Sequence, residues 1–395
     1  MDGKKMKSRN RYVILGIAAC VNFVHGNPYI WTVFQPYVKE EFGLSAAASS
    51  QPFTIIIGIF AVGNMIGGYL QHRLGAKRTI LLGSYVMCAG FLLAAVAPYE
   101  MPWLISAGYG VIGGLGSGCA FSLLVAVPQA WFPDKKGLVT GITIGVVGIS
   151  GVVMNPLCDY ILAARGYRAA MLAVTGIYAA LCLGAFLIEE APEGDAGLKG
   201  IIVEEGGQYA PVRQCTTKEM VRTRTFYLIS AIMALAVPSY VLVNPLMKSL
   251  GMERGLTGGQ ALAGVVAASF ANIIGRFAMP WLSDRTGCRV VIQAMYGAAM
   301  VSVLGLTVAR GGVFIVLISM VCFVYGGVVS VFPVLVSDYF GMKYQGMNFG
   351  AVMLGYGVVS ILCPYLLEAA GQTMSFVVAG AACGIGMLGM RALKK

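Results

Sequence analysis

Residues 312–336 read GVFIVLISMVCFVYGGVVSVFPVLV, a run of 25 residues without a single charge. A helix of about 20 residues crosses the hydrocarbon core of a bilayer, which is about 30 Å thick. Backbone groups in lipid must be satisfied within their own segment, so this run predicts a membrane-spanning helix. Eleven further apolar blocks accompany it, and we predict helices over residues 12–35, 46–70, 78–98, 102–128, 138–163, 168–188, 225–248, 257–281, 288–309, 346–369 and 372–391.

The composition indicates an all-α membrane protein and excludes several other classes. Hydrophobic residues make up 58% of the 395 residues and charged residues only 11%, against about 25% charged residues in a soluble domain. A β-barrel would show alternating segments of about ten residues, which the sequence lacks. The ten cysteines form no CxxC pair and no metal-ligand spacing, so we interpret them as small buried residues and expect neither a metal nor a cofactor.

The formal net charge of +11 reports membrane topology and not nucleic-acid binding, because the basic residues lie in short loops. Of the 28 Lys and Arg, 21 fall on the side of the N-terminus and six on the opposite side. The positive-inside rule then places both termini in the cytoplasm. The first apolar block lacks a small-residue cleavage site, so we interpret it as a retained helix. We expect a multi-pass protein of the cell membrane, the inner membrane if the source is bacterial.

A polar stretch rich in Glu and Gly divides the twelve blocks into two sets of six. We predict an N-terminal six-helix bundle over residues 1–188, a cytoplasmic linker over residues 189–224 and a C-terminal six-helix bundle over residues 225–395.

Four short motifs recur in the same order at an offset of 208 to 212 residues. They pair Pro36–Lys39 with Pro245–Lys248, Gly43–Ser45 with Gly255–Thr257, His72–Gly75 with Asp284–Gly287, and Trp131–Gly141 with Tyr339–Gly350. The two sets are therefore copies of one unit, and we predict two pseudo-symmetric six-helix bundles. Such repeats place a substrate site between the halves, near the middle of the membrane.

Two loops resemble known family signatures. Residues 68–78, GYLQHRLGAKR, resemble the loop signature G-x-L-x-D-R-x-G-x-K/R-R of the major facilitator superfamily, with His72 where the family prefers Asp. Residues 131–141, WFPDKKGLVTG, closely resemble the W-F-P-D-K-R-G-x-x-x-G loop of the oxalate/formate antiporter family, relatives of the monocarboxylate transporters. The resemblance covers nearly the whole chain. It implies the major facilitator fold and a secondary active transporter that works by alternating access.

The loop signatures also suggest a gate on the cytoplasmic side. Its physical basis is an acid near a helix end that pairs with basic loop groups when this side is closed. The C-terminal copy of the signature, residues 281–287, keeps its acid. We predict gating roles for Asp284, Arg285, Arg73, Asp134 and Asp338.

Arg276 is the one basic residue that belongs to no predicted loop. It precedes Asp284 by eight residues, about 12 Å of helix. A central Arg costs about 2.5–3.5 kcal/mol on insertion scales, and its planar fork fits one carboxylate through two hydrogen bonds. The helix over residues 257–281 contains no acid, so we predict that Arg276 binds a carboxylate substrate; the alternative is an Arg that snorkels or pairs with an acid elsewhere. The family resemblance implies the same role.

The resemblance further implies that oxalate-type members hold a second cation, a Lys, at the position of Tyr356. Two buried cations match a dianion, whereas one matches a monoanion. Two aromatic residues of the family site are changed here, to Phe121 and Val329, which makes the predicted pocket wider and more apolar. We therefore expect a monocarboxylate larger than formate, and place Tyr356, Phe121 and Val329 at the site.

Four more side chains are predicted to line this site. Asn272 shares a helix face with Arg276 at i, i+4 spacing. His25 and Tyr29 lie on one stripe of the first helix, and Tyr240 lies on the seventh. His25 is either a proton site, since an unperturbed imidazole has a pKa of about 6.5, or a hydrogen-bonded packing residue. Tyr240 and Tyr356 either line the site or pack in the core.

The sequence leaves two transport modes open. Proton symport is favoured because the second cation is absent; exchange of one anion for another is the alternative. The expected partners are a small carboxylate, a lipid bilayer and, in symport, a proton, with no nucleic acid and with a monomer as the working unit. We do not expect an enzyme, because the two His are accompanied by no nucleophile motif and no metal cluster.

Overall fold

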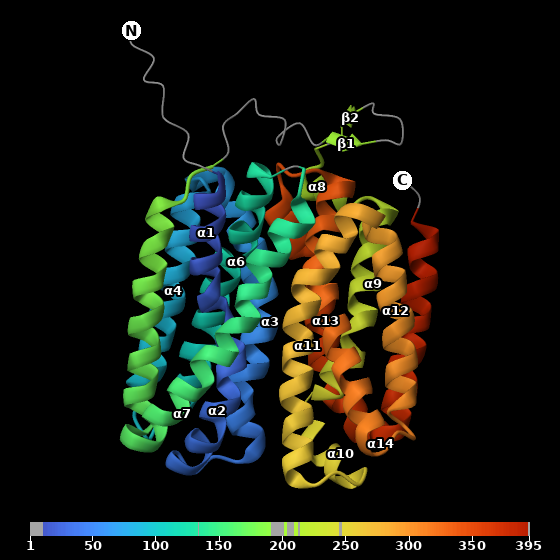
Figure 1. The fold of residues 1–395 in the computed structure, drawn as a ribbon. Coiled ribbons are helices and arrows are strands. Elements are labelled where there is room, and N and C mark those ends of the chain that lie inside the picture. The colour runs from blue at the N-terminus through green and yellow to red at the C-terminus, as the bar shows by residue number, and fades with distance from the viewer. Residues whose placement is uncertain are drawn as a thin grey trace.

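The computed structural model describes residues 11–132, 134–190, 201–203, 209–211, 214–244 and 247–393. Most of these residues are helical, and the long helices stand side by side along one direction (Figure 1). Short 3-10 segments (η1, η3) and one π-helical segment (η2) interrupt them. In chain order the elements are α1 Arg11–Asn22, η1 Phe23–Gly26, α2 Asn27–Glu41, α3 Ala46–Leu74, α4 Ala76–Ala95, α5 Trp103–Ile105, η2 Ser106–Ile112, α6 Gly113–Trp131, α7 Lys136–Cys182, η3 Leu183–Leu187, β1 Ile201–Val203, β2 Tyr209–Pro211, α8 Thr217–Met220, α9 Arg224–Val241, α10 Met247–Glu253, α11 Gly258–Thr286, α12 Cys288–Gly305, α13 Gly311–Phe340 and α14 Gln345–Ala392.

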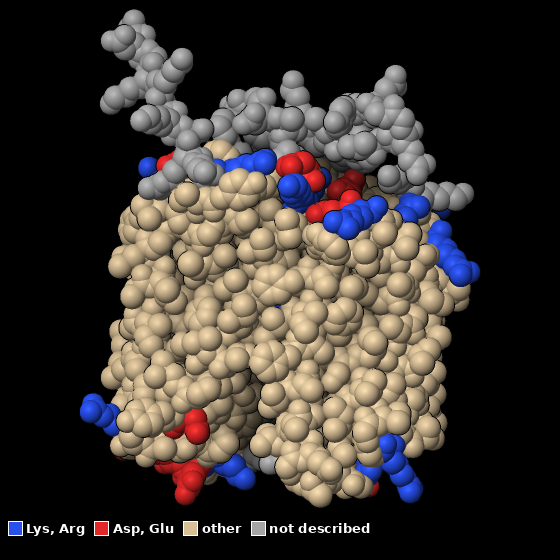
Figure 2. All heavy atoms as spheres, in the orientation of Figure 1, with Lys and Arg blue, Asp and Glu red and all other residues tan. Residues whose placement is uncertain are grey.

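The helices provide twelve membrane crossings. In the described part of the chain, 11 helical runs are long and apolar enough to span a membrane. The run Lys136–Leu187 has 52 residues, and Gly166 at φ 76° reverses the chain inside it, so it crosses twice. Acidic and basic side chains gather at the two ends of the helices and leave an apolar band between them (Figure 2). The predicted twelve-helix membrane protein is confirmed.

The helices form two groups that lie next to each other, an N-group of α1 to α7 and a C-group of α9 to α14 (Figure 1). Corresponding helices of the groups share their local structure. α3 and α11 both have 29 residues, and the side chains of Ser45 and Thr257 cap their first turns by accepting from an amide three residues later. Gly75 and Gly287 end them at φ 80° and φ 84°, a conformation that favours glycine.

One end of the helices carries β1, β2 and α8, and we call it the linker end; the opposite end is the far end (Figure 1). β1 and β2 pair antiparallel with Ile201 opposite Pro211, a small hairpin that the sequence analysis did not predict. The basic residues before Arg11 and the last two lysines lie outside the described residues. The domain limits and the cytoplasmic position of the linker end therefore stay predictions.

Glycines bring α7 of the N-group close to α11 of the C-group. A Cβ added at Gly137 would lie 1.9 Å from the carbonyl oxygen of Pro280, and one at Gly145 would lie 2.3 Å from the ring of Phe277. Small residues allow this approach of helix backbones within a membrane. The glycines of α7 on this face are Gly137, Gly141, Gly145 and Gly148.

A second contact between the groups joins α3 and α14. A Cβ at Gly68 would lie 2.3 Å from the backbone of Met347, near the linker end. At the far end, the surface between the two groups is hollowed (Figure 2), and α7 and α11 diverge (Figure 1). The two groups are therefore closed against each other at the linker end and apart at the far end.

Candidate substrate-binding site

The central feature of the candidate site is Arg276, which α11 holds between α13 and α7. Gly275 and Gly326 bring α11 against α13, because a Cβ at either position would lie about 2 Å from a carbonyl oxygen of the other helix. Gly148 of α7 faces the side chain of Arg276, whose Cδ would lie 3.4 Å from an added Cβ. The Arg276 side chain is consequently only 2% exposed.

Three neutral groups bind the Arg276 guanidinium. Nε donates to Oδ1 of Asn272 at 3.0 Å, Nη1 donates to the carbonyl oxygen of Ile144 at 3.3 Å, and Nη2 donates to the phenol oxygen of Tyr29 at 2.5 Å. Nδ2 of Asn272 in turn donates to the carbonyl oxygen of Cys322 at 2.9 Å, which fixes the amide. Tyr29 and Ile144 belong to the N-group and Arg276 to the C-group, so these bonds join the two groups.

The guanidinium keeps unused donors. It has five N–H groups, and three of them are used by the contacts above, which leaves one N–H on each terminal nitrogen. No carboxylate of the described residues contacts Arg276, whereas Arg11 and Lys136 each pair with an Asp. A carboxylate has two oxygens and can accept from both terminal nitrogens of a guanidinium, so the unused N–H groups leave Arg276 able to bind one.

Four tyrosines surround this cation, and three of them contact one another. The rings of Tyr240 and Tyr325 stack with centroids 3.7 Å apart, and the hydroxyls of Tyr325 and Tyr356 are hydrogen bonded. Tyr29, Tyr240 and Tyr325 all lie within electrostatic range of Arg276, and so does Tyr356. The structure thus brings the predicted residues Tyr29, Tyr240 and Tyr356 together with Arg276.

Tyr325 was not among the residues predicted to line the site. It lies one turn before Val329 in α13, at the i, i+4 spacing that puts both on one helix face. Because Val329 was already assigned to the site, this spacing could have identified Tyr325.

Phe121 and His25 lie deeper in the N-group. Their rings meet edge to face with centroids 6.2 Å apart, and Phe121 also contacts the ring of Phe60 at 5.0 Å. Phe121 and Val329 belong to the same apolar cluster as Tyr29 and Tyr356. His25 has no contact with Arg276 and bonds to Ser117 in α6, with Nδ1 2.9 Å from Oγ.

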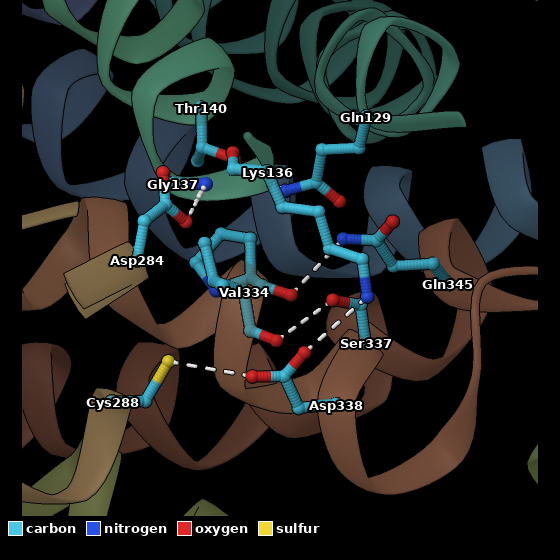
Figure 3. A network of polar contacts seen from close by, with 11 residues as sticks. Gln129, Lys136, Gly137, Thr140, Asp284, Cys288, Val334, Ser337, Asp338 and Gln345 are labelled. Carbon is cyan, nitrogen blue, oxygen red and sulfur yellow. Dashed lines mark hydrogen bonds and ion pairs between the residues drawn. The ribbon is translucent and has the colours of Figure 1, made fainter. Parts of the chain in front are cut away.

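Asp284 joins the two groups at the linker end (Figure 3). Its carboxylate oxygens accept from the backbone amides of Gly137 at 2.7 Å and Leu138 at 2.9 Å. These amides lie in the first turn of α7, where unpaired N–H groups and the helix dipole favour an anion. We expected basic loop side chains as partners of such acids, and Lys136 of this loop pairs with Asp338. The hydrogen bonds that Asp284 accepts come from the N-terminus of α7.

A second contact across the groups involves Asp338 of α13. Its Oδ1 lies 3.3 Å from Nζ of Lys136 in an ion pair, and Sγ of Cys288 donates to its Oδ2 at 3.6 Å (Figure 3). Lys136 belongs to the N-group, so this pair also joins the groups at the linker end.

The remaining residues predicted to gate have partners within their own group. The Asp134 carboxylate lies 3.5 Å from Arg11. The guanidinium of Arg285 lies 4.0 Å from the ring of Trp281, and that of Arg73 lies 4.9 Å from the ring of Tyr69. Their gating roles stay predictions. No group of three His, Cys, Asp or Glu in the described ranges could hold a metal ion.

Comparison with known proteins identifies similar chains. The family model described as Major Facilitator Superfamily matches residues 14–364. The uncharacterized MFS-type transporter YhjX of Escherichia coli (strain K12) is 26% identical over 358 residues, covering 89% of this chain and 86% of that protein. The oxalate:formate antiporter of Oxalobacter formigenes is 27% identical over 373 residues, covering 89% and 83%.

A solved structure shows the same fold. The crystal structure of FucP, a major facilitator superfamily transporter in the outward conformation, aligns with a TM-score of 0.73 at 15% identity, covering 98% of this chain and 100% of that chain. These matches confirm the resemblance from which the fold was predicted.

The contact of Asp284 with α7 predicts an effect on backbone exchange. In Asp284→Ala, the amide hydrogens of Gly137 and Leu138 should exchange about 10- to 100-fold faster with solvent, because a hydrogen bond to a charged group contributes about 1.5–3 kcal/mol. Hydrogen–deuterium exchange mass spectrometry of the peptide that starts at Lys136 measures this change. Asp134→Ala is the matched control, since Asp134 contacts Arg11 of its own group. Equal exchange in the two variants would contradict the assignment.

Proposed function

The chain belongs to the major facilitator superfamily and is a membrane transporter, and from that premise we propose that it carries a small organic monocarboxylate, with Arg276 binding the carboxylate. The observation that carries this proposal is the Arg276 guanidinium, 2% exposed, whose partners among the described residues are all neutral. A buried charge without a counter-ion is costly. The transported anion supplies the missing negative charge.

The single cation is the reason for proposing a monoanion. The four tyrosines add hydroxyl groups around Arg276 and no second positive charge. A dicarboxylate placed here would have one carboxylate paired with the guanidinium and the other desolvated without a partner. A monocarboxylate meets the charge of the site, and its remaining atoms would contact Phe121, Val329 and the phenol rings.

The packing of the two groups supports the proposed alternating access. Contacts at the linker end close one side of the site, while the surface is hollowed at the far end (Figure 2). We propose that the linker end is cytoplasmic and that the groups rock about the glycine face of α7 against α11. Opening of the linker end then requires Asp284 to leave the α7 amides and Asp338 to leave Lys136.

The proposed mode is symport with a proton, and anion exchange is the second candidate because the oxalate:formate antiporter is among the relatives. A panel of formate, glycolate, lactate, pyruvate and benzoate is first tested for binding by thermal shift. Uptake of the best-bound acid into proteoliposomes then separates the two modes. We expect saturable uptake into vesicles without internal anion, driven by an inward proton gradient; a strict requirement for internal anion would establish exchange.

Replacement of the site cation tests the site. In Arg276→Lys, affinity for the best-bound acid of the panel should fall about 10- to 100-fold, because lysine cannot form the two parallel hydrogen bonds that a guanidinium gives a carboxylate. Binding and uptake are measured on protein that elutes as a single species. Arg289→Lys is the matched control, since Arg289 also donates to a tyrosine hydroxyl, at 2.8 Å, but lies at the linker end. Similar losses in both variants would refute the assignment.

Introduction of a second cation tests the charge argument. Tyr356→Lys should raise the preference for oxalate over the best-bound monocarboxylate by at least about tenfold, because the dianion then meets two charges. Competition by unlabelled oxalate against labelled monocarboxylate measures this preference. Tyr356→Phe removes the hydroxyl without adding charge and should leave oxalate a poor competitor. The charge argument is wrong if Tyr356→Lys and Tyr356→Phe compete alike.

A further inference from the structure

The first membrane span is interrupted near its middle, and the interruption carries His25. The α-helical segments α1 and α2 are separated by the 3-10 segment Phe23–Gly26. Irregular backbone at membrane depth is tolerated where protein buries it or where it lines water. Here it is packed against α7, because a Cβ at Gly26 would lie 2.4 Å from Cβ of Ser150. His25 is only 3% exposed.

The hydrogen bonds around His25 determine where its proton sits. Nδ2 of Asn27 faces three acceptors, the carbonyl oxygen of Val24 at 3.1 Å, Sδ of Met87 at 3.2 Å and Oγ of Ser117 at 3.3 Å, which fixes the orientation of the amide. Since Ser117 Oγ accepts from Asn27, its own O–H is free to donate to Nδ1 of His25, 2.9 Å away. Nδ1 is then the acceptor of the neutral ring, and Nε2 carries the hydrogen.

Two buried polar atoms of this network have no partner in the described part of the chain. One is Nε2 of His25 and the other is Oδ1 of Asn27. Buried polar groups are normally hydrogen bonded, so an unpaired donor and an unpaired acceptor around one imidazole call for an explanation. Hydrogen bonds among the described residues therefore leave the polar groups around His25 incompletely paired.

The surroundings of His25 contain no fixed charge. No charged side chain of the described residues acts on its ring. The titratable groups on the elements packed around it are phenols and thiols, and neither kind of group carries a positive charge. They are the partly buried Tyr29 in α2 and the buried Cys88 in α4, Tyr109 in η2, Cys119 in α6, and Cys158, Tyr178 and Cys182 in α7.

We propose that His25 is the group that binds the co-transported proton. This inference rests on the proposed function, and it adds the residue that couples the proton to the carboxylate. The proton adds to the lone pair of Nδ1, and no covalent bond is broken. Ser117 Oγ then accepts from Nδ1 instead of donating to it, and its own hydrogen turns away from the ring. The imidazole ring gains one positive charge and loses it again when the proton is released on the other side of the membrane.

Tyr29 links this proton site to the anion site. It follows His25 by one helical turn, and its phenol oxygen accepts from Nη2 of Arg276. The coupling between the proton site and the anion site then runs through Tyr29, which shares the first membrane span with His25 and a hydrogen bond with Arg276. Symport requires that binding of the anion and binding of the proton promote each other.

Replacement of His25 by a non-titrating residue tests the proposal. His25→Gln keeps a hydrogen-bonding group next to Ser117 but cannot take up a proton. Proteoliposomes containing a pH-sensitive dye report proton entry during uptake of the best-bound panel acid, and exchange of labelled for unlabelled acid without a pH gradient reports anion translocation alone. We expect His25→Gln to lose proton entry and gradient-driven accumulation at least tenfold while retaining measurable exchange. His72→Gln, which removes the other His of the chain, should keep the wild-type proton-to-acid ratio.

A second variant keeps the proposal testable if His25→Gln does not fold. Ser117→Ala leaves the imidazole but removes the partner of Nδ1, so the pH at which uptake is half-maximal should shift by at least half a unit. A wild-type pH profile in Ser117→Ala, or a wild-type proton-to-acid ratio in His25→Gln, overturns the proposal. Proton-free exchange by the wild type would also overturn it, yet would leave carboxylate binding at Arg276 intact. Failure of the proposed function itself would appear as unchanged binding in Arg276→Lys.

Discussion

The structure is organised around one permanent positive charge for which the described residues supply no counter-ion. Arg276 is 2% exposed, and within that part of the chain its hydrogen-bond partners are an amide, a carbonyl oxygen and a phenol. Neutral dipoles disperse the charge, but they do not cancel it. The close glycine contacts of α11 with α13 and α7 keep this environment narrow. This buried cation with two unused N–H groups is the constraint on which the proposed carboxylate cargo rests.

Much of the fold could be predicted because it depends on short stretches of sequence. Long uncharged runs define the membrane helices, and the repeat of Ser45 at Thr257 and of Gly75 at Gly287 reflects the same caps in both groups. Arg276 was identifiable because a charge within an apolar block is rare. Tyr325 and the partners of Asp284 were not predicted. Tyr325 could have been found from its spacing to Val329 in α13. The partners of Asp284 lie in a helix far away in the chain, and periodicity within one helix does not encode such contacts.

The duplicated halves are alike in backbone and different in chemistry at the linker end. Asp284 at the end of α11 binds the first amides of α7. The matching position at the end of α3 holds His72, whose ring lies 4.7 Å from that of Tyr344, just before α14. An anion thus caps one helix across the interface, whereas an aromatic contact occupies the other. The two interfaces that must separate during opening are therefore held by different forces: hydrogen bonds to a carboxylate on one side, ring and backbone packing on the other.

Counting charges connects the two proposed binding groups. The empty carrier has one positive charge at Arg276, the carrier with anion alone is neutral there, and the carrier with anion and proton is again positive by one. In exchange, only the carrier with bound anion has to reorient, and the uncompensated charge of Arg276 would prevent reorientation of the carrier without anion. In symport the empty form must return, so the charge of Arg276 has to be tolerated without cargo. The contacts with Asn272, Ile144 and Tyr29 spread the charge of Arg276 over neutral dipoles, and this is the tolerance that the proposed symport requires.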